Sequence, residues 1–193
     1  MPLATALSKI APLSQGCQEA LRTVSKSLAM KAGRNLLTLG QISDKLYYIE
    51  AGLVHAFYDT DISREVSNWF DQEDGWVFSV QSFFKQIPSN EYIQLLEDSQ
   101  LITIDYQDLQ ELLNQYPELN LPFRLIYERY LIVYDKRIQL FREKDVLKRY
   151  QGFLDLYPRL ACRLQVKHIA QFLNLAPATL SRIRKKLAEA PPN

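Results

Sequence analysis

The sequence predicts an α+β protein: an antiparallel β-roll with flanking helices, followed by a long helix and a small all-α domain. Three patterns predict this fold class. Between residues 35 and 103, short β-like runs alternate with turn residues. Over residues 117–144, apolar side chains recur at helical spacing. Over residues 166–189, a short apolar-patterned segment precedes a strongly basic one.

The β-rich region follows a helix that we expect over about residues 13–29. Six short runs are expected as strands, at residues 36–39, 45–50, 53–58, 65–70, 92–96 and 101–104. Gly40, the Ala51-Gly52 pair and the turn cluster at residues 59–63 separate them. Many short strands with tight turns indicate an antiparallel barrel or roll. Its interior is either filled by side chains or hollow enough for a small ligand, and the sequence leaves both alternatives open.

Helical patterns return after Tyr106, first over residues 106–114 and then over residues 117–144. The longer helix carries a heptad-like seam formed by Leu119, Phe123, Ile126, Tyr130, Val133, Arg137 and Leu140. Such a seam packs either against its own domain or against a second copy of the helix. Because Arg137 interrupts the seam and the roll also covers one side, we favour self-pairing through Phe123, Ile126, Tyr130, Val133, Arg137 and Leu140. One more helix, over residues 145–157, ends before Pro158 and is expected to pack beneath the C-terminal segment.

The segment at residues 166–189 has the form of a helix-turn-helix. Its two helices meet across Asn174-Leu175-Ala176, before Pro177, which suits the first position of a helix. Apolar residues let the helices share a core: Ile169, Phe172 and Leu173 in the first, and Leu180, Ile183 and Leu187 in the second. The other side of the second helix carries Ala178, Thr179, Arg182, Lys185 and Lys186. Short side chains followed by cations suit a helix that enters a DNA major groove.

The alternative interpretation of this basic helix is a structural cap, whose Lys and Arg residues complement the helix dipole. The charge distribution favours DNA binding instead. From residue 142 onward the chain has eleven basic and four acidic residues, whereas residues 1–141 have twelve basic and eighteen acidic residues. A basic tail behind an acidic body is typical of a nucleic-acid-binding module attached to another domain.

Length and composition restrict the class of protein. With 193 residues, 47% of them hydrophobic, the chain is expected to form one large or two small globular domains. It has no apolar run of the roughly 18 residues that span a bilayer and no signal-peptide pattern, so we expect a cytoplasmic protein without a membrane partner. Cys17 and Cys162 lack metal-ligand spacing and are expected to be buried hydrophobes, and no metal is predicted. His55 and His168 are expected in different domains without a nucleophile motif, so catalysis is not expected.

The order of these elements resembles the Crp/Fnr family of bacterial transcription regulators. The resemblance covers almost the whole chain and is carried by KLYYIEAGLVHAFY at residues 45–58, YIQLLEDSQLITIDYQDLQELL at 92–113 and HIAQFLNLAPATLSRIRKKL at 168–187. It implies a cyclic-nucleotide-binding-like roll over residues 1–116, a dimerisation helix over 117–144 and a helix-turn-helix domain over 145–193. Double-stranded DNA and a second copy of the chain are the implied partners, and RNA polymerase is a further candidate.

The resemblance weakens where cyclic-AMP-binding members hold the nucleotide. In those members a short helical cassette carries a Glu for the ribose hydroxyl and an Arg for the cyclic phosphate. Here residues 75–90 contain no acidic residue, Lys85 is the only base, and Ser89-Asn90 stands where the Arg-Ser pair is expected. A buried phosphate needs a charged partner, so cyclic AMP bound in the family's way is not expected.

Two alternatives remain for the roll. It binds an unidentified, more apolar small-molecule effector, or side chains fill it and it binds nothing. The aromatic residues Trp69, Trp76, Phe78, Phe83 and Phe84 are candidate pocket walls, although core positions are favoured for them. No cofactor is predicted. The candidate ligand-binding residues are Trp76, Ser79, Ser89 and Asn90 in the roll, and Tyr134 and Asp135, which match the long-helix positions facing the base in cyclic-AMP binders and are otherwise exposed helix residues.

The resemblance also implies roles in DNA binding. Arg182 matches the arginine that reaches a base edge, and Thr179 and Ser181 are expected to approach bases or backbone. Lys185 and Lys186 are expected at phosphates, with Lys167 and His168 near the sugar-phosphate chain, although His168 is equally well read as a neutral surface histidine. Only residues 190–193 follow the second helix, too few for the family's two-stranded wing, which predicts lower affinity. The competing hypothesis is a sensor or protein-interaction scaffold that has lost DNA binding.

Overall fold

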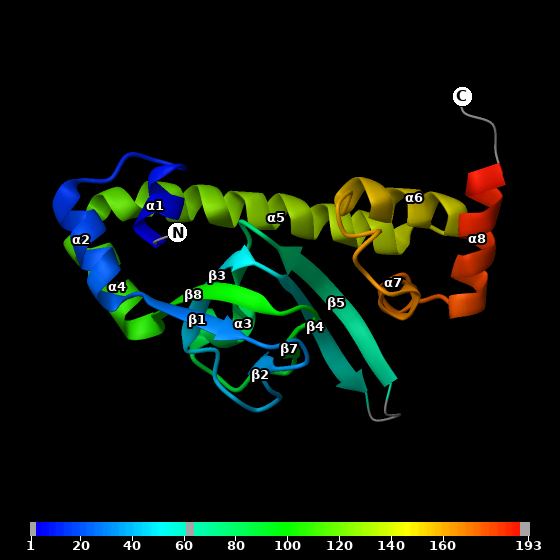
Figure 1. Cartoon of the computed structure of the whole chain (residues 1–193), viewed down its shortest axis with the longest axis horizontal. Helices are drawn as coiled ribbons and strands as arrows, with labels where there is room; N and C mark the ends of the chain where they lie inside the picture. Colours follow the sequence, from blue (N-terminus) through cyan, green and yellow to red (C-terminus); the bar gives the residue numbers. More distant parts are fainter. Residues whose placement is uncertain (1–2, 61–63, 190–193) are drawn as a thin grey trace.

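The computed structural model describes residues 3–60 and 64–189. Its helices are α1 (Leu3–Ser8), α2 (Gln15–Val24), α3 (Val80–Lys85), α4 (Tyr106–Gln115), the 3-10 turn η1 (Pro117–Leu119), α5 (Asn120–Arg142), α6 (Val146–Leu156), α7 (Val166–Phe172) and α8 (Pro177–Glu189). Its strands are β1 (Lys26–Met30), β2 (Asn35–Leu37), β3 (Lys45–Ala51), β4 (Leu53–Thr60), β5 (Arg64–Gln72), β6 (Trp76–Val77), β7 (Tyr92–Leu95) and β8 (Ser99–Asp105). Figure 1 shows α5 along one side of the molecule and the strands beneath it, with α1, α2 and α4 at one end and α6, α7 and α8 at the other.

The strands form two four-stranded antiparallel sheets, in the orders β1-β8-β3-β6 and β2-β7-β4-β5. Side chains from both sheets meet in a common core, in which Ile49, Val54, Leu95 and Leu101 are fully buried. Each of the six runs predicted as strands overlaps one of these strands. The predicted α+β fold, an antiparallel β-roll with flanking helices and a long helix, is therefore confirmed.

The N-terminal helix is shorter than the sequence predicts. The chain becomes extended at Ser25, with φ −83° and ψ 143°, and α2 ends there. Residues 26–30 then pair with β8, from Lys26 opposite Thr103 to Met30 opposite Ser99. The expectation of helix up to residue 29 is wrong because hydrogen bonds to a distant strand decide the conformation of this segment. Strand β6 and helix α3 were not expected either, and residues 61–63 of the predicted turn lie outside the described residues.

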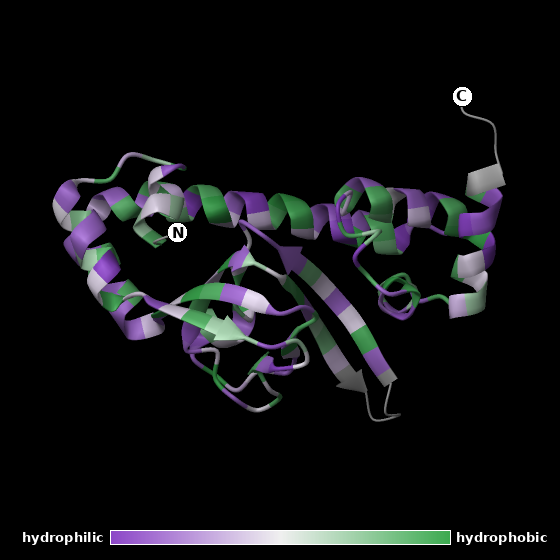
Figure 2. Cartoon of the chain, viewed as in Figure 1, coloured by the Kyte–Doolittle hydropathy of each residue, from purple (hydrophilic) through white to green (hydrophobic). Residues whose placement is uncertain are grey.

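The predicted seam of α5 packs against the chain's own body. Phe123, Ile126, Arg137 and Leu140 are at most 9% exposed, and Tyr130 and Val133 are partly buried. The prediction that this seam pairs with a second copy is wrong for the four buried positions, because the roll and the helices at both ends of the molecule already cover them. Figure 2 shows hydrophobic residues recurring along the whole length of α5. Its exposed apolar residues are Leu121, Leu131, Ile132, Tyr134 and Phe141.

The two cysteines have different environments. Cys17 is buried in the core beside α1, whereas Cys162 is exposed in the connection between α6 and α7. The expectation that both are buried is therefore wrong for Cys162. Within the described part of the chain, no helix has the length and apolar character that crossing a membrane requires. Residues 3–60 and 64–189 contain no group of three or more His, Cys, Asp or Glu side chains that could hold a metal ion.

Candidate functional site

The C-terminal helices α6, α7 and α8 share one apolar core. Phe153, Ile169, Leu173 and Leu180 are fully buried in it, and Ile183 and Leu187 pack against its edge. The chain turns sharply between α7 and α8, where Asn174 has a left-handed backbone with φ 51° and the Leu175 amide donates to the Ala170 carbonyl at 2.8 Å. The apolar faces predicted for the two helices therefore do meet.

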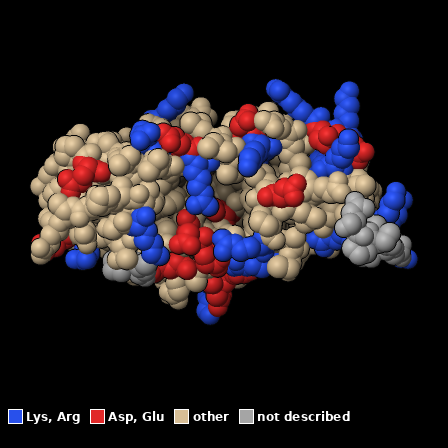
Figure 3. All heavy atoms as spheres, turned by 90° about the horizontal axis from the view of Figure 1, so that it is seen from above, with Lys and Arg blue, Asp and Glu red and all other residues tan. Residues whose placement is uncertain are grey.

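The opposite face of α8 is open to solvent. Ser181, Arg182, Lys185 and Lys186 are exposed, Thr179 is half-buried, and Lys167 is exposed near the start of α7. The Arg182 guanidinium lies along its own helix, with Nε 3.4 Å from the Ala178 carbonyl oxygen. Figure 3 shows lysine and arginine side chains protruding at the end of the molecule that carries these helices. The structure thus brings the cations predicted on α8 to one accessible surface.

Arg184 lies on a different face of the helix from Arg182. Its Nε donates to the Tyr150 hydroxyl at 3.0 Å, and Nη2 donates to the Ala161 carbonyl at 3.3 Å. Two residues along a helix correspond to a rotation of roughly 200°, so neighbouring cations in the sequence face opposite ways. Arg184 therefore fixes α8 to α6 and is not part of the exposed basic face.

An arginine clamp joins the C-terminal helices to the roll. Arg163, in the connection between α6 and α7, forms ion pairs with Glu73 at 2.7 Å and Glu97 at 2.6 Å, and donates to the Gly52 carbonyl at 3.2 Å. The Arg163 hydrogen bonds lower the pKa of Glu73 to about 2. These partners come from three turns of the roll that are far apart in sequence, so no sequence signal predicted the clamp.

The two histidines of the chain meet at the same junction. Their ring centroids lie 5.1 Å apart, and His55 Nε2 is 2.8 Å from the Ser67 hydroxyl oxygen. His168 is only 7% exposed, so the structure places it against the roll and not at the surface predicted for DNA contact. Desolvation lowers the pKa of His55 to about 3 and also lowers the pKa of His168. Both rings are therefore neutral at pH 7 and lie in one interface, between β4 of the roll and α7.

The six residues predicted to bind a ligand do not converge. Ser79 and Ser89 are buried and lie 3.4 Å apart between their hydroxyl oxygens. Asn90, Tyr134 and Asp135 are exposed, and Trp76 instead contacts Tyr48 and Phe123. Trp69, Phe78 and Phe83 are buried, which agrees with the core positions favoured for them from the sequence. Phe84 is 48% exposed.

A hydrogen-bonded polar network lies beside the two buried serines. The Ser89 hydroxyl donates to the Glu91 carbonyl at 2.9 Å, and the Glu91 carboxylate accepts from Asn68 Nδ2 at 2.9 Å. Asn68 Oδ1 accepts from Arg137 Nη2 of α5 at 2.8 Å. Glu91 and Arg137 are each only 4% exposed. This network was missed from the sequence because Arg137 was assigned to a helix-helix seam.

Comparisons with known proteins agree with this fold. Residues 28–116 match the family model described as the cyclic nucleotide-binding domain. This part of the chain has the cyclic nucleotide-binding fold. No curated protein sequence matches the chain.

Solved structures resemble more than this domain. The c-di-GMP-responsive global regulator CLP of Xanthomonas campestris aligns with a TM-score of 0.72 and 17% identity, over 91% of this chain and 92% of that one. FixK2 of Bradyrhizobium japonicum aligns with a TM-score of 0.74 and 14% identity, over 86% and 85%. A CooA mutant from Carboxydothermus hydrogenoformans aligns with a TM-score of 0.72 and 14% identity, over 97% and 84%. At these identities the likeness establishes a shared fold.

The arginine clamp predicts a loss of stability when its cation is removed. Arg163→Met leaves two partly buried carboxylates of the roll, Glu73 and Glu97, without their cation, which should lower the free energy of unfolding by about 1–3 kcal/mol. Urea denaturation measures this change. Arg159→Met removes an exposed arginine from the same connection and serves as the control. Equal stability of the two variants would contradict the role of the clamp.

The buried histidines predict sensitivity to mild acid. Unfolded histidine binds a proton below about pH 6.5, whereas the folded pKa of His55 is about 3. The contribution of neutral His55 to the free energy of unfolding is therefore fully present above about pH 6.5. It is lost as the pH falls toward the folded pKa, by about 2 kcal/mol between pH 7 and pH 5 for His55 alone. Urea denaturation across this range should give a smaller loss for His55→Gln than for the unmodified protein. Identical pH dependence of the two proteins would refute the assignment.

Proposed function

We propose that the protein is a DNA-binding transcription regulator of the Crp/Fnr type. The observation that carries this proposal is the exposed basic face of α8, which lies opposite a buried apolar face in a tightly turned helix pair. Likeness over most of the chain to the global regulator CLP supports it. In this proposal α7 and α8 form a helix-turn-helix, and α8 enters the major groove of double-stranded DNA.

Each cation of α8 has a distinct role in this proposal. Arg182, midway along the exposed face, reads a base edge, most often guanine, by bidentate hydrogen bonding. Lys185 and Lys186 contact phosphates further along the groove, and Thr179 and Ser181 approach bases or backbone. Lys167 contributes a phosphate contact from α7. His168 has no role at the DNA, because it is buried against the roll.

The effector domain does not hold cyclic AMP in the usual way. Ser79 and Ser89 are hydrogen-bonded to their own surroundings, and Arg137, Asn68 and Glu91 form a polar network beside them. Displacing Arg137 would expose buried groups that are now satisfied, which costs free energy.

A regulator of this kind acts in the cytoplasm without catalysis, and RNA polymerase is a candidate partner.

Dimerisation is proposed through the outward face of α5. Leu131 and Ile132 are 62% and 58% exposed, and Leu121 is 43% exposed on the same helix. Exposed aliphatic residues at this density on one helix indicate an interaction surface. Pairing there would bring two α8 helices into one assembly, as recognition of a two-fold DNA site requires.

DNA binding is tested by fluorescence anisotropy with a pool of genomic fragments. We expect affinity that falls steeply with salt, because lysine and arginine release counterions from phosphates. Arg182→Ala should weaken binding to a selected site by about 1–3 kcal/mol and relax its sequence preference. Arg124→Ala, which removes an arginine of α5 paired with Glu128, should leave both unchanged. Recovery of a protein partner without any salt-dependent DNA binding would favour the scaffold hypothesis instead.

The dimer surface is tested by adding charge to it. Leu131→Glu places a carboxylate at the most exposed apolar position of α5, so it should shift the protein to a monomer in sedimentation velocity. Leu39→Glu alters an equally apolar side chain, 52% exposed, on the roll and should leave the assembly unchanged. A monomeric unmodified protein, or a Leu131→Glu variant that still forms dimers, would exclude this surface.

A further inference from the structure

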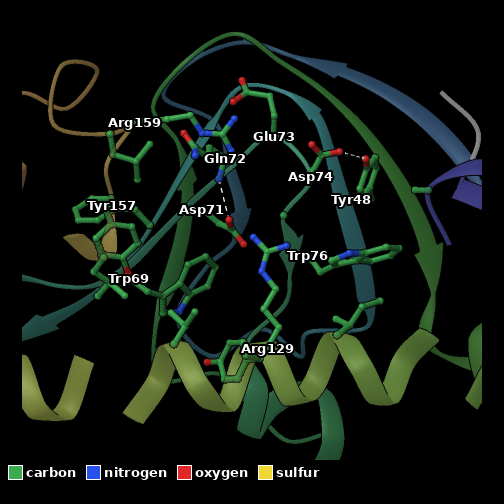
Figure 4. Close-up of a pocket in the computed structure, with 18 of the residues that line it drawn as sticks. Tyr48, Trp69, Asp71, Gln72, Glu73, Asp74, Trp76, Arg129, Tyr157 and Arg159 are labelled. Carbon is green, nitrogen blue, oxygen red and sulfur yellow. Dashed lines mark hydrogen bonds between the residues drawn. The ribbon is translucent and has the colours of Figure 1, made fainter. Parts of the chain in front are cut away.

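A cavity of about 560 Å³ lies between α5 and the edge of the roll, and its lining does not include Ser79 or Ser89. Trp69 and Asp71 of β5, Trp76 of β6, and Arg129 and Tyr130 of α5 line its middle. Tyr157 and Arg159 close one end, and α1 borders the other. Figure 4 shows Arg129 rising from α5 toward Asp71, with Trp76 beside it. This volume suits a small organic molecule.

The cavity is bordered by a buried cation that has no ionic partner. Arg137 is 4% exposed, and no carboxylate of the described residues pairs with it within salt-bridge distance. Its Nη2 is satisfied by Asn68 and its guanidinium lies 5.6 Å from the Tyr134 ring, but its Nε has no hydrogen-bond partner. An unpaired buried charge is costly. An anion in the adjoining cavity would offset that cost.

Other polar groups around the cavity also lack acceptors. The Tyr157 hydroxyl is buried and has no hydrogen-bond partner. Arg159 lines the same end and is exposed to the cavity mouth. The acidic lining residues are already engaged: Glu73 pairs with Arg163, and Asp74 accepts from the Tyr48 hydroxyl at 2.6 Å. Asp71 accepts from the Gln72 amide at 2.9 Å and faces Arg129. The lining carboxylates are therefore engaged, whereas Arg137 Nε and the Tyr157 hydroxyl have no hydrogen-bond partner.

The remaining walls are aromatic or aliphatic. Trp69, Trp76 and Tyr130 present rings, and Leu125 and Val133 of α5 add aliphatic surface. Aromatic walls with a few fixed charges bind flat ligands that carry a charged group at one edge.

We propose that this cavity binds a small aromatic anion, a carboxylate or sulfonate, whose acidic group is held by Arg137 and Arg129 and whose ring lies against Trp76. The ligand would touch both α5 and the connection between α6 and α7, because Tyr157 and Arg159 line the same space. This inference goes beyond the proposed function and stands without it, since it concerns binding of a small molecule and not of DNA.

Tryptophan fluorescence can report binding in this cavity, because the chain has two tryptophans and both line it. The probe is anilinonaphthalene sulfonate, an aromatic anion that accepts energy from excited tryptophan. We expect saturable quenching of tryptophan emission and sensitised emission of the probe. Its uncharged analogue phenylnaphthylamine should bind about tenfold or more weakly, because the charge-assisted hydrogen bonds are lost.

Matched variants separate this site from other apolar surfaces. Arg129→Gln removes an exposed arginine from the lining and should weaken the sulfonate about tenfold without affecting the analogue. Arg142→Gln removes an exposed arginine of α5 outside the lining and should change neither. Absence of quenching, equal binding of the charged and uncharged probes, or equal behaviour of the two variants would each overturn the proposal.

Discussion

The packing of Phe70 against the C-terminal helices holds the two halves of the chain together. Its ring lies 5.6 Å from Phe172 of α7, 6.0 Å from Tyr157 and 4.8 Å from His55. It is 4% exposed, and burial of such a ring contributes about 2–3 kcal/mol. Because Leu53 and Phe70 of the roll share a cluster with Leu140 of α5, the roll, the long helix and the C-terminal helices form one core. The position of α8 is therefore set by the roll.

Polar contacts around this core specify one orientation. The Arg163 clamp holds its two glutamates in fixed directions, and the histidine pair places two neutral rings where a charge would be unfavourable. Apolar packing alone is tolerant of sliding, whereas charge-assisted hydrogen bonds are directional. In the proposed regulator, any signal that moves α7 and the α6–α7 connection relative to the roll must separate these groups. The junction is thus the element whose two states a ligand would have to favour differently.

The roll combines an internal polar network with an open flank. In the network, Arg137 donates to Asn68, and Asn68 donates to the Glu91 carboxylate. On the flank, the same arginine borders a cavity with tryptophan walls. One side chain of α5 therefore belongs both to the internal network and to the lining of the flank cavity. The ligand site proposed above lies where the roll contacts the long helix.

The sequence by itself determined the order and type of most elements. Alternating runs with turn residues predicted six of the strands, and helical periodicity predicted α4, α5, α6 and the α7–α8 pair, because local periodicity reports which face is buried. The exposed cations of α8 were also predicted, since opposite faces of one helix follow directly from residue spacing.

Only the tertiary structure decided what each buried face packs against. The sequence pattern of the seam with Phe123 and Leu140 is the same whether a second chain or the roll covers it. Residues 26–30 form strand β1 because β8 lies beside them. His55 and His168, Arg163 and its glutamates, and Arg137 and Asn68 are each brought together across at least 66 residues of sequence. Spacing predicts contacts within an element, whereas the pairing of distant side chains depends on how the elements close around one core, and no local pattern specifies that.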